Sequence, residues 1–148
     1  MKVALGQFAV SREWQENADT CLALMAQAAR AGADLLVLPE AILARDNTSP
    51  AYVVEAAQPE EGPFLRRLLT ASEGSRLTII FTQHVPAPGE RAINTLFALH
   101  QGQIIARYEK LHLYDAFAVQ ESARVNAGQQ IPPLITVAGM KVGLMTCY

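Results

Sequence analysis

The segment from Ala33 to Leu38 constrains the fold more than any other part of the sequence. After Asp34 it is continuously apolar, with no alternation of polar and apolar residues, which is typical of a strand buried on both faces of a sheet. Pro39 ends this strand and Glu40 follows at once, so a carboxylate stands at the carboxyl end of a buried strand. Functional sites of α/β proteins gather at that end. Taken alone, however, Glu40 would more simply be a solvated loop residue.

Helical periodicity predicts helices before and after this strand. The first should begin near Trp14, with Ser11 as its cap, and should end at Gly32. Its apolar face carries Ala18, Cys21, Leu22, Met25, Ala28 and Ala29. A second helix should run from Pro63 to Gly74, and a shorter one could occur within residues 47–58.

Six further segments are predicted to be strands because they are rich in β-branched residues or alternate in polarity. They cover residues 2–10, 78–82, 93–100, 103–108, 134–137 and 141–147. Gln101-Gly102 predicts a hairpin turn, and Pro86, Pro88 and Gly89 predict a loop. The order strand, helix, strand, helix and then several strands predicts one domain, residues 1–148, with a layered α/β or α+β fold in which helices cover a sheet.

Composition and charge exclude several classes of protein. Hydrophobic residues make up 51% of the 148 residues, which is enough for a core. The formal net charge of -2 gives no electrostatic reason to expect nucleic acid or anionic membranes as partners. No apolar run reaches the roughly 18 residues of a membrane span, and the N-terminus lacks the apolar centre of a signal peptide. We therefore expect a cytoplasmic protein without a metal or cofactor.

The two cysteines make neither a disulfide framework nor a zinc site. Cys21 lies on the apolar face of the first predicted helix, so we interpret it as a packing residue. Cys147 ends the apolar run that begins at Val142, and this run predicts a buried strand with a thiol at its tip. Such a thiol has the rigid support and the open side that a nucleophile requires. A cysteine that merely packs in the core is the simpler alternative.

Three short blocks of the sequence carry a resemblance to a known family. Leu38-Pro39-Glu40, the stretch from Tyr108 to Leu113 and the stretch from Gly143 to Tyr148 resemble the signature blocks of the nitrilase, or carbon–nitrogen hydrolase, superfamily. Val3 to Gln7 and the pair Asn94-Thr95 are also similar. Each block alone would be weak, but three in the family's order are specific, and the resemblance covers the whole chain.

The resemblance implies a site in which Glu40 is the general base, Lys110 lies beside the developing oxyanion and Cys147 is the nucleophile. The chemistry is coherent, because a neighbouring ammonium favours a thiolate. A carboxylate can also take the thiol proton, pass it to the leaving amine and later activate water. The backbone N–H of Tyr148 could help to bind the oxyanion. By analogy with the family, Glu121 would orient Lys110 or bind the substrate amide.

A finer resemblance indicates a branch of the family. The segment from Tyr108 to Phe117, with Gln120-Glu121-Ser122 and Ala127-Gly128 after it, is similar to amidases that hydrolyse deaminated glutathione and free α-ketoglutarate from cysteinylglycine. The alternative branch is ω-amidase, which acts on α-ketoglutaramate or related monoamides. Both reactions require recognition of a small carboxylate, for which Arg124 or a residue beyond this chain would supply the positive charge.

The sequence departs from the family at Tyr148, because family members continue through further strands and helices that complete a four-layer αββα sandwich. We therefore expect residues 1–148 to form the N-terminal half of that sandwich, an incomplete domain with little hydrolytic activity of its own. An inactive remnant that completes itself against another chain stays open as a function of a different class. For full-length relatives, the resemblance implies homo-oligomers.

Three histidines leave a Cys-His hydrolase as the less favoured alternative. His84 is predicted at a strand end, His100 on a hairpin strand and His112 in the loop after Lys110. No Asn or Asp block accompanies them. Only His112 lies near the motif, and we expect it to pack or to form local hydrogen bonds.

Overall fold

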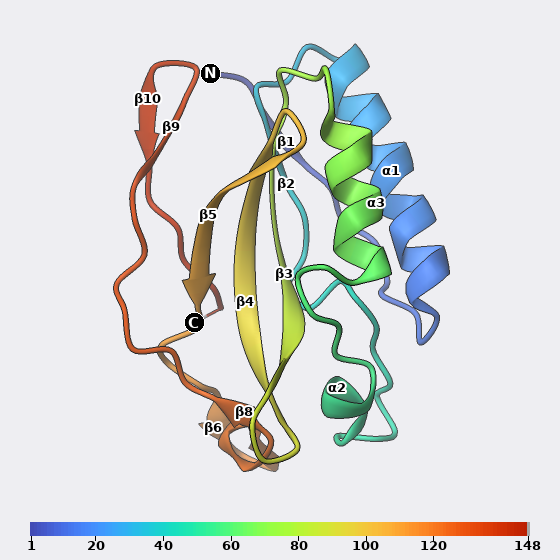
Figure 1. The fold of residues 1–148 in the computed structure, drawn as a ribbon, viewed down its shortest axis with the longest axis vertical. Helices are drawn as coiled ribbons and strands as arrows, with labels where there is room; N and C mark the ends of the chain where they lie inside the picture. The colour runs from blue at the N-terminus through green and yellow to red at the C-terminus, as the bar shows by residue number, and fades with distance from the viewer. Residues whose placement is uncertain (148) are drawn as a thin grey trace.

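A mixed six-stranded sheet forms the centre of residues 1–147, the part of the chain that the computed structural model describes (Figure 1). Its strands are β1 Val3–Leu5, β2 Leu35–Val37, β3 Thr78–Ala87, β4 Arg91–His100, β5 Gln103–Glu109 and β8 Val125–Asn126. They lie in the order β1-β2-β3-β4-β5, with β8 paired to β4. β1, β2 and β3 are parallel to one another, whereas β3, β4 and β5 alternate in direction.

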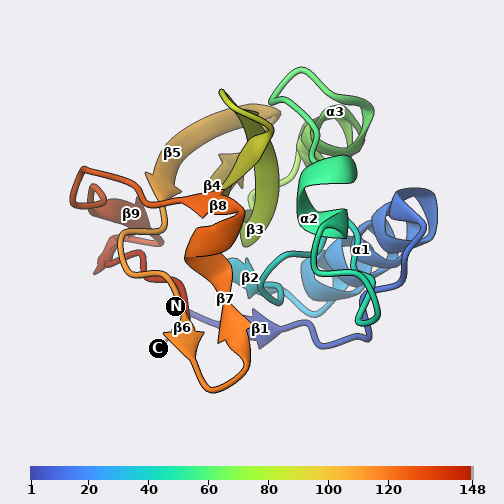
Figure 2. The same ribbon diagram turned by 90° about the horizontal axis from the view of Figure 1, so that it is seen from below.

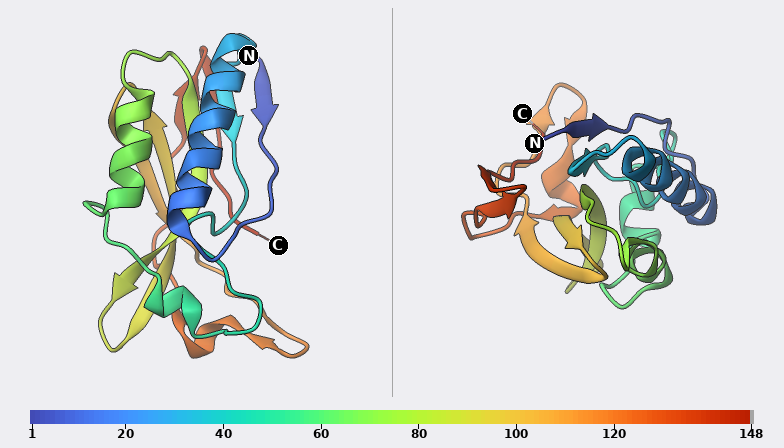
Figure 3. Two further views of the ribbon diagram at one scale, coloured as in Figure 1. Left: turned by 90° about the vertical axis from the view of Figure 1, so that its right-hand side faces the viewer. Right: turned by 90° about the horizontal axis from the view of Figure 1, so that it is seen from above.

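Both faces of the sheet are covered, which gives the chain its layers. The helices α1 (Trp14–Arg30) and α3 (Pro63–Ser72) pack side by side on one face (Figures 1 and 2). In Figure 3, α1 lies beside β2, and α3 lies beside β4 and β5. A hairpin of β9 (Ile135–Val137) and β10 (Met140–Val142) lies against the other face. The predicted layered α/β fold is confirmed.

The strand on which the prediction was based is buried as expected. Leu36 of β2 packs under the helices with Phe64, Phe81 and Phe97, while its neighbour Leu35 packs toward the β9–β10 hairpin. Leu35 is 4% exposed and Leu36 is 1% exposed. Because successive side chains of a strand point to opposite faces, only a strand between two layers buries both.

The start of α1 is built differently from the prediction. Glu13, not Ser11, occupies the N-cap position, and its side chain makes no capping hydrogen bond. The Ser11 hydroxyl instead accepts the Glu13 N–H at 3.1 Å and donates to the Glu16 carboxylate at 2.9 Å. Asn17 then ties the helix to the loop after β2, because its Nδ2 donates to Leu43 O at 3.0 Å. Gly32, with φ of 70°, ends the helix as predicted.

Two strands differ in length from the prediction. β1 ends at Leu5 instead of Val10, because β2 is its only partner within the described part of the chain and Pro39 follows soon after the end of β2. β3 continues through Pro86 to Ala87, so the predicted loop at Pro86 is wrong. The pairing of β3 with β2 stops at Ile80, while its pairing with β4 continues to the end of the strand. A proline is tolerated where one edge of a strand is free of a ladder.

Turn and helix signals in the middle of the chain are confirmed. The predicted helix at Pro63 is α3, which has this proline in its first turn. The shorter helix expected within residues 47–58 is α2, which spans Tyr52–Glu55. Gln101 and Gly102 have φ of 49° and 76°, the left-handed pair of a tight hairpin turn between β4 and β5. Ala138 and Gly139 repeat this geometry between β9 and β10.

The predicted strand that carries Cys147 at its tip is wrong. β10 ends at Val142, the last residue that pairs with β9, and residues 143–147 follow as irregular chain. Leu144 is buried and anchors this segment under the sheet, whereas Cys147 is exposed and has a left-handed φ of 64°. A strand requires a neighbour to share its hydrogen bonds, and within residues 1–147 none pairs beyond Val142.

The segment from Lys110 to Pro133, in which no helix or strand was predicted, contains small elements of its own. β6 (Asp115–Ala116) and β7 (Val119–Gln120) form a short hairpin, and a 3₁₀ turn at Glu121–Ala123 leads into β8. None of the helices in residues 1–147 has the length and apolar character of a membrane-spanning segment.

Candidate active site

An ammonium group held between two carboxylates forms the centre of the candidate site. Lys110 Nζ donates to Glu40 Oε1 at 3.1 Å and to Glu121 Oε2 at 2.8 Å. Glu40 follows β2, Lys110 follows β5 and Glu121 begins the 3₁₀ turn, so three separate parts of the chain meet here. The sequence blocks that suggested Glu40, Lys110 and Glu121 are thus brought together by the fold.

Lys110 is fixed through its backbone as well as its side chain. Its N–H donates to Asn94 O, and its carbonyl accepts the N–H of Gly128, each at 2.9 Å. Gly128 has no room for a side chain, because a Cβ there would lie 2.3 Å from Glu109 O. The side chain of Lys110 is 3% exposed. Burial by itself would lower the Lys110 pKa, but the Glu121 hydrogen bond and the Glu40 charge outweigh it, so the pKa is raised. Lys110 therefore stays charged.

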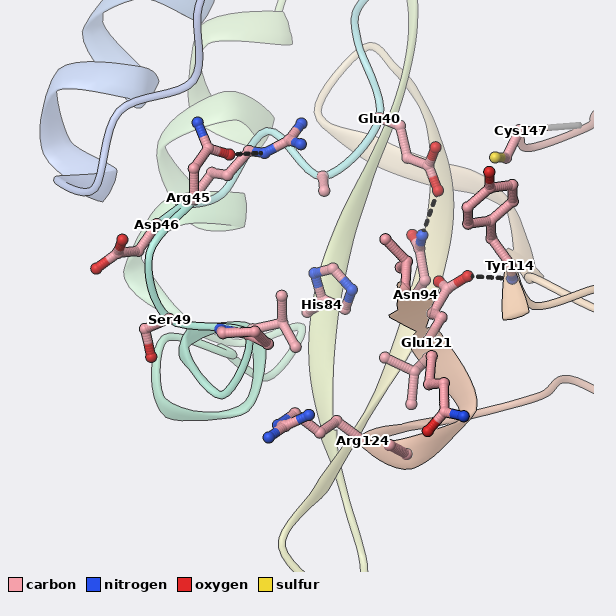
Figure 4. A pocket seen from close by; sticks show the side chains of 18 of the residues that line it. Glu40, Arg45, Asp46, Ser49, His84, Asn94, Tyr114, Glu121, Arg124 and Cys147 are labelled. Atoms are coloured by element: carbon pink, nitrogen blue, oxygen red, sulfur yellow. Dashed lines mark hydrogen bonds between the residues drawn. The ribbon is translucent and has the colours of Figure 1, made fainter. Parts of the chain in front are cut away.

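The two carboxylates are themselves positioned by hydrogen bonds. Asn94 Nδ2 donates to Glu40 Oε1 at 2.7 Å, and the Tyr114 N–H donates to Glu121 Oε2 at 2.7 Å (Figure 4). Ala41, directly after Glu40, has a φ of 57° and donates its N–H to Thr82 Oγ1 at 2.7 Å. Such a conformation is costly for alanine and persists where neighbouring contacts impose it. The backbone turn after β2 thus aims Glu40 at Lys110.

These side chains line a cavity of about 700 Å³. Glu40, Lys110, Glu121 and Cys147 all border it, and so does Arg124. Figure 4 shows Cys147 at one end of the group, on the side of Glu40 and Tyr114. The predicted nucleophile, base, lysine and second glutamate therefore face one space. Within residues 1–147, no group of His, Cys, Asp and Glu side chains has the arrangement of a metal site.

Besides Glu121, two residues were predicted to bind the substrate, and their outcomes differ. Arg124 is half-buried, lines the cavity and is held through its backbone, since its N–H donates to Glu121 O at 3.1 Å and its carbonyl accepts from Ala92 N at 3.0 Å. Tyr148, whose backbone N–H was expected to bind the oxyanion, lies outside the described residues.

Two side chains of the site were not predicted as site residues. Asn94 was noted only for its resemblance to the family, and its hydrogen bond to Glu40 could not be read from the sequence. His84 was weighed only as a partner of the cysteine. It lines the cavity, but Figure 4 places Asn94 and Glu121 between it and Cys147. His100 lies elsewhere, with its Nδ1 3.3 Å from Thr78 Oγ1. The arrangement thus gives no support to a Cys-His pair.

The two cysteines are expected to differ strongly in reactivity toward iodoacetamide. Cys147 is exposed, whereas Cys21 is fully buried in the core and burial raises its pKa to about 12. Since the thiolate is the reacting form, Cys147 should be alkylated at least about a hundredfold faster. Peptide mass spectrometry over a time course measures both rates, and the same experiment in guanidinium should make them similar. Equal rates in the folded protein would contradict the assignment of Cys21 to the core.

Comparison with known proteins identifies relatives of the whole chain. The deaminated glutathione amidase of Escherichia coli O157:H7 is 57% identical over 148 residues, which are 100% of this chain and 56% of that protein. The human deaminated glutathione amidase is 29% identical over 160 residues, covering 99% of this chain and 48% of that protein. The chain thus spans about half the length of these curated relatives.

A solved structure shows the same fold. A variant of the amidase from Nesterenkonia sp. AN1, 26% identical, matches with a TM-score of 0.83 over 100% of this chain and 57% of that chain. That structure shows Michael addition of acrylamide at its active-site cysteine. The sequence profile described as carbon-nitrogen hydrolase matches residues 2–148. The resemblance carried by the three sequence blocks is therefore confirmed, and the chain belongs to the carbon–nitrogen hydrolase family.

Proposed function

We propose that this chain carries the catalytic residues of an amidase that hydrolyses a small linear amide through a cysteine thioester. The observation that supports this proposal is the charged Lys110 held between Glu40 and Glu121 in a cavity that Cys147 also lines. A buried ammonium with two carboxylates provides a base, a positive charge and a positioning group around one thiol. The names of the curated relatives agree with this reaction class.

The first half of the proposed reaction forms the thioester. Glu40 takes the proton of the Cys147 thiol, and the sulfur attacks the carbonyl carbon of the amide. Lys110, which is already charged, stabilises the negative oxygen of the tetrahedral intermediate. When the C–N bond breaks, the proton held by Glu40 passes to the leaving nitrogen. Glu121 fixes the Lys110 ammonium throughout and serves as a positioning residue.

The second half releases the acid. Glu40, again ionised, takes a proton from a water molecule, whose oxygen attacks the thioester carbon. The second tetrahedral intermediate uses the same positive charge of Lys110. It collapses by breaking the C–S bond, so the carboxylic acid leaves and the thiol regains its proton. One amide and one water thereby give one acid and one amine.

For the substrate we propose deaminated glutathione, an amide with a carboxylate next to a 2-oxo group on its acyl side. Arg124 supplies a positive charge in the cavity for such a group. The alternative is an ω-amidase-like reaction on α-ketoglutaramate, which has the same acyl chain and only ammonia as its leaving group. A free thiol at Cys147 fits a reducing compartment such as the cytoplasm. Assembly as a homo-oligomer stays a prediction from the family.

Hydrolysis of the two amides tests the proposed function. The natural polypeptide that contains this chain should release cysteinylglycine from deaminated glutathione with a higher kcat/KM than it releases ammonia from α-ketoglutaramate. The reverse order would favour the alternative, and release from neither would refute the amidase. The isolated 148-residue chain should be far slower, because Cys147 is exposed and lies on irregular backbone. The matched comparison is a hybrid protein in which these 148 residues are followed by the remaining residues of the Escherichia coli relative.

A further inference from the structure

His84 is a buried side chain of the cavity that the proposed mechanism does not use. It lies on β3 and is 7% exposed. The strand register pairs it with Asn94 on β4, so both side chains leave the same face of the sheet. Asn94 Nδ2 donates to Glu40 Oε1 at 2.7 Å, so the residue paired with His84 directly contacts the carboxylate of the proposed base. Figure 4 shows its ring directed into the cavity.

The ring of His84 has no hydrogen-bond partner among residues 1–147, although buried polar groups are almost always paired. Within residues 1–147, three buried side-chain atoms have neither solvent contact nor a hydrogen-bond partner, namely Gln83 Oε1, Asn94 Oδ1 and Thr146 Oγ1, and the His84 nitrogens are not among them. The nitrogens thus face the cavity instead of the protein interior. A polar ligand that enters the cavity would satisfy them.

The charges around His84 determine what kind of ligand it can bind. Burial lowers its pKa, and although Glu121 and Glu40 act in the opposite direction, Lys110 adds to the lowering. The net pKa lies below the usual 6.5, so the ring is neutral at pH 7. A neutral imidazole offers one N–H donor and one acceptor.

Arg124 complements this neutral donor with a charge. Within residues 1–147 its guanidinium makes no recorded ion pair or side-chain hydrogen bond, and it borders the same cavity. Figure 4 shows it below His84, on the side of the site away from Cys147. A substrate whose amide carbon lies at Cys147 would therefore direct its acyl chain toward this pair.

We propose that His84 and Arg124 form the subsite for the anionic end of the acyl chain. The His84 N–H donates to a 2-oxo or carboxylate oxygen, and Arg124 supplies the countercharge. The subsite selects amides of 2-oxo dicarboxylic acids over neutral amides of the same length. This inference rests on the proposed amidase reaction for its catalytic readout, but it can also be measured as binding.

Paired substrates and paired variants test the subsite in the natural polypeptide that contains this chain. His84→Leu and Arg124→Gln should each raise KM for α-ketoglutaramate by about tenfold or more, with kcat within about threefold, because a hydrogen bond to a charged group is lost. Both should leave kcat/KM for neutral pentanamide within about threefold. His84→Gln, which keeps an N–H donor, should restore part of the affinity. Arg66→Gln, an exposed arginine outside the cavity, is the charge control.

Equal losses of kcat/KM for α-ketoglutaramate and for pentanamide would overturn the subsite. They would mean that His84 supports the structure of the site and does not recognise the anionic group. Unchanged KM for α-ketoglutaramate in both variants would overturn it as well. Calorimetric binding of 2-oxoglutarate tests the subsite without catalysis. The wild type should bind 2-oxoglutarate at least about tenfold more tightly than either variant. A wild type that binds 2-oxoglutarate but cleaves neither amide refutes the proposed function and leaves the subsite standing. Cooperative thermal unfolding of each variant shows that it folds.

Discussion

Cys147→Ala is expected to abolish amide hydrolysis in the natural polypeptide that contains this chain, with a loss in kcat of about ten-thousandfold or more. The sulfur forms the only covalent bond that the proposed mechanism makes between enzyme and substrate. Without it, Glu40 and Lys110 can polarise an amide and activate water but cannot divide the reaction into two steps. Release of cysteinylglycine from deaminated glutathione measures the loss.

The second cysteine supplies the matched control. Cys21→Ala removes the same atom from the core beneath α1, where the thiol is fully buried. It should lower the thermal unfolding temperature slightly and leave kcat unchanged, whereas Cys147→Ala should leave the unfolding temperature nearly unchanged because Cys147 is exposed. Intact-mass spectrometry of the wild type during turnover should detect the acyl adduct. Substantial turnover by Cys147→Ala, or an adduct on Cys21, would refute the assignment of the nucleophile.

The fold could be predicted where local chemistry decides the structure. The apolar run before Pro39 specified a strand between two layers, and Gln101-Gly102 specified a tight turn, because both depend on residues adjacent in sequence. The extent of β3 through Pro86 could not be predicted in this way. Whether a proline harms a strand depends on which edge is paired, and that is a property of the whole sheet.

The candidate site shows the same division. Glu40, Lys110, Glu121 and Cys147 were predicted through family resemblance, and the fold brings all four to one cavity. The support for Cys147 was not predicted correctly, because a strand after Val142 requires a pairing partner that sequence periodicity does not reveal.

His84 shows why register matters for identifying a site. A shift of one residue between β3 and β4 would turn its ring to the opposite face of the sheet. Its position opposite Asn94 is therefore a fact of strand pairing and not of composition. The same holds for the depth of Lys110, since lysines are almost always exposed unless they are paired.

Lys110→Met is expected to impair both catalysis and folding. Loss of the positive charge at the oxyanion should lower kcat by about a hundredfold to a thousandfold. The substitution also leaves Glu121, which is 15% exposed, without its partner in the buried ion pair. Loss of both ion pairs should lower the free energy of unfolding by about 3 kcal/mol. The Lys110–Glu40 pair should contribute less of this than the Lys110–Glu121 pair, because Glu40 is more exposed to solvent. Activity assays and thermal unfolding measure the two effects separately, and Lys141→Met, on the exposed part of β10, is the matched control.

The pH dependence of stability distinguishes loss of the ion pair from loss of packing. The Lys110 pKa is raised above the 10.5 of an unfolded lysine, so the folded state binds this proton more tightly. The stabilisation from the ion pair is therefore complete below about pH 10.5 and disappears as the pH rises through the higher folded-state pKa. The difference in unfolding free energy between wild type and Lys110→Met should stay constant from pH 7 to about pH 10 and shrink above it. A difference that persists unchanged at higher pH would mean that the methionine fails for reasons of shape, and that the charge of Lys110 does not hold Glu40 and Glu121 in place.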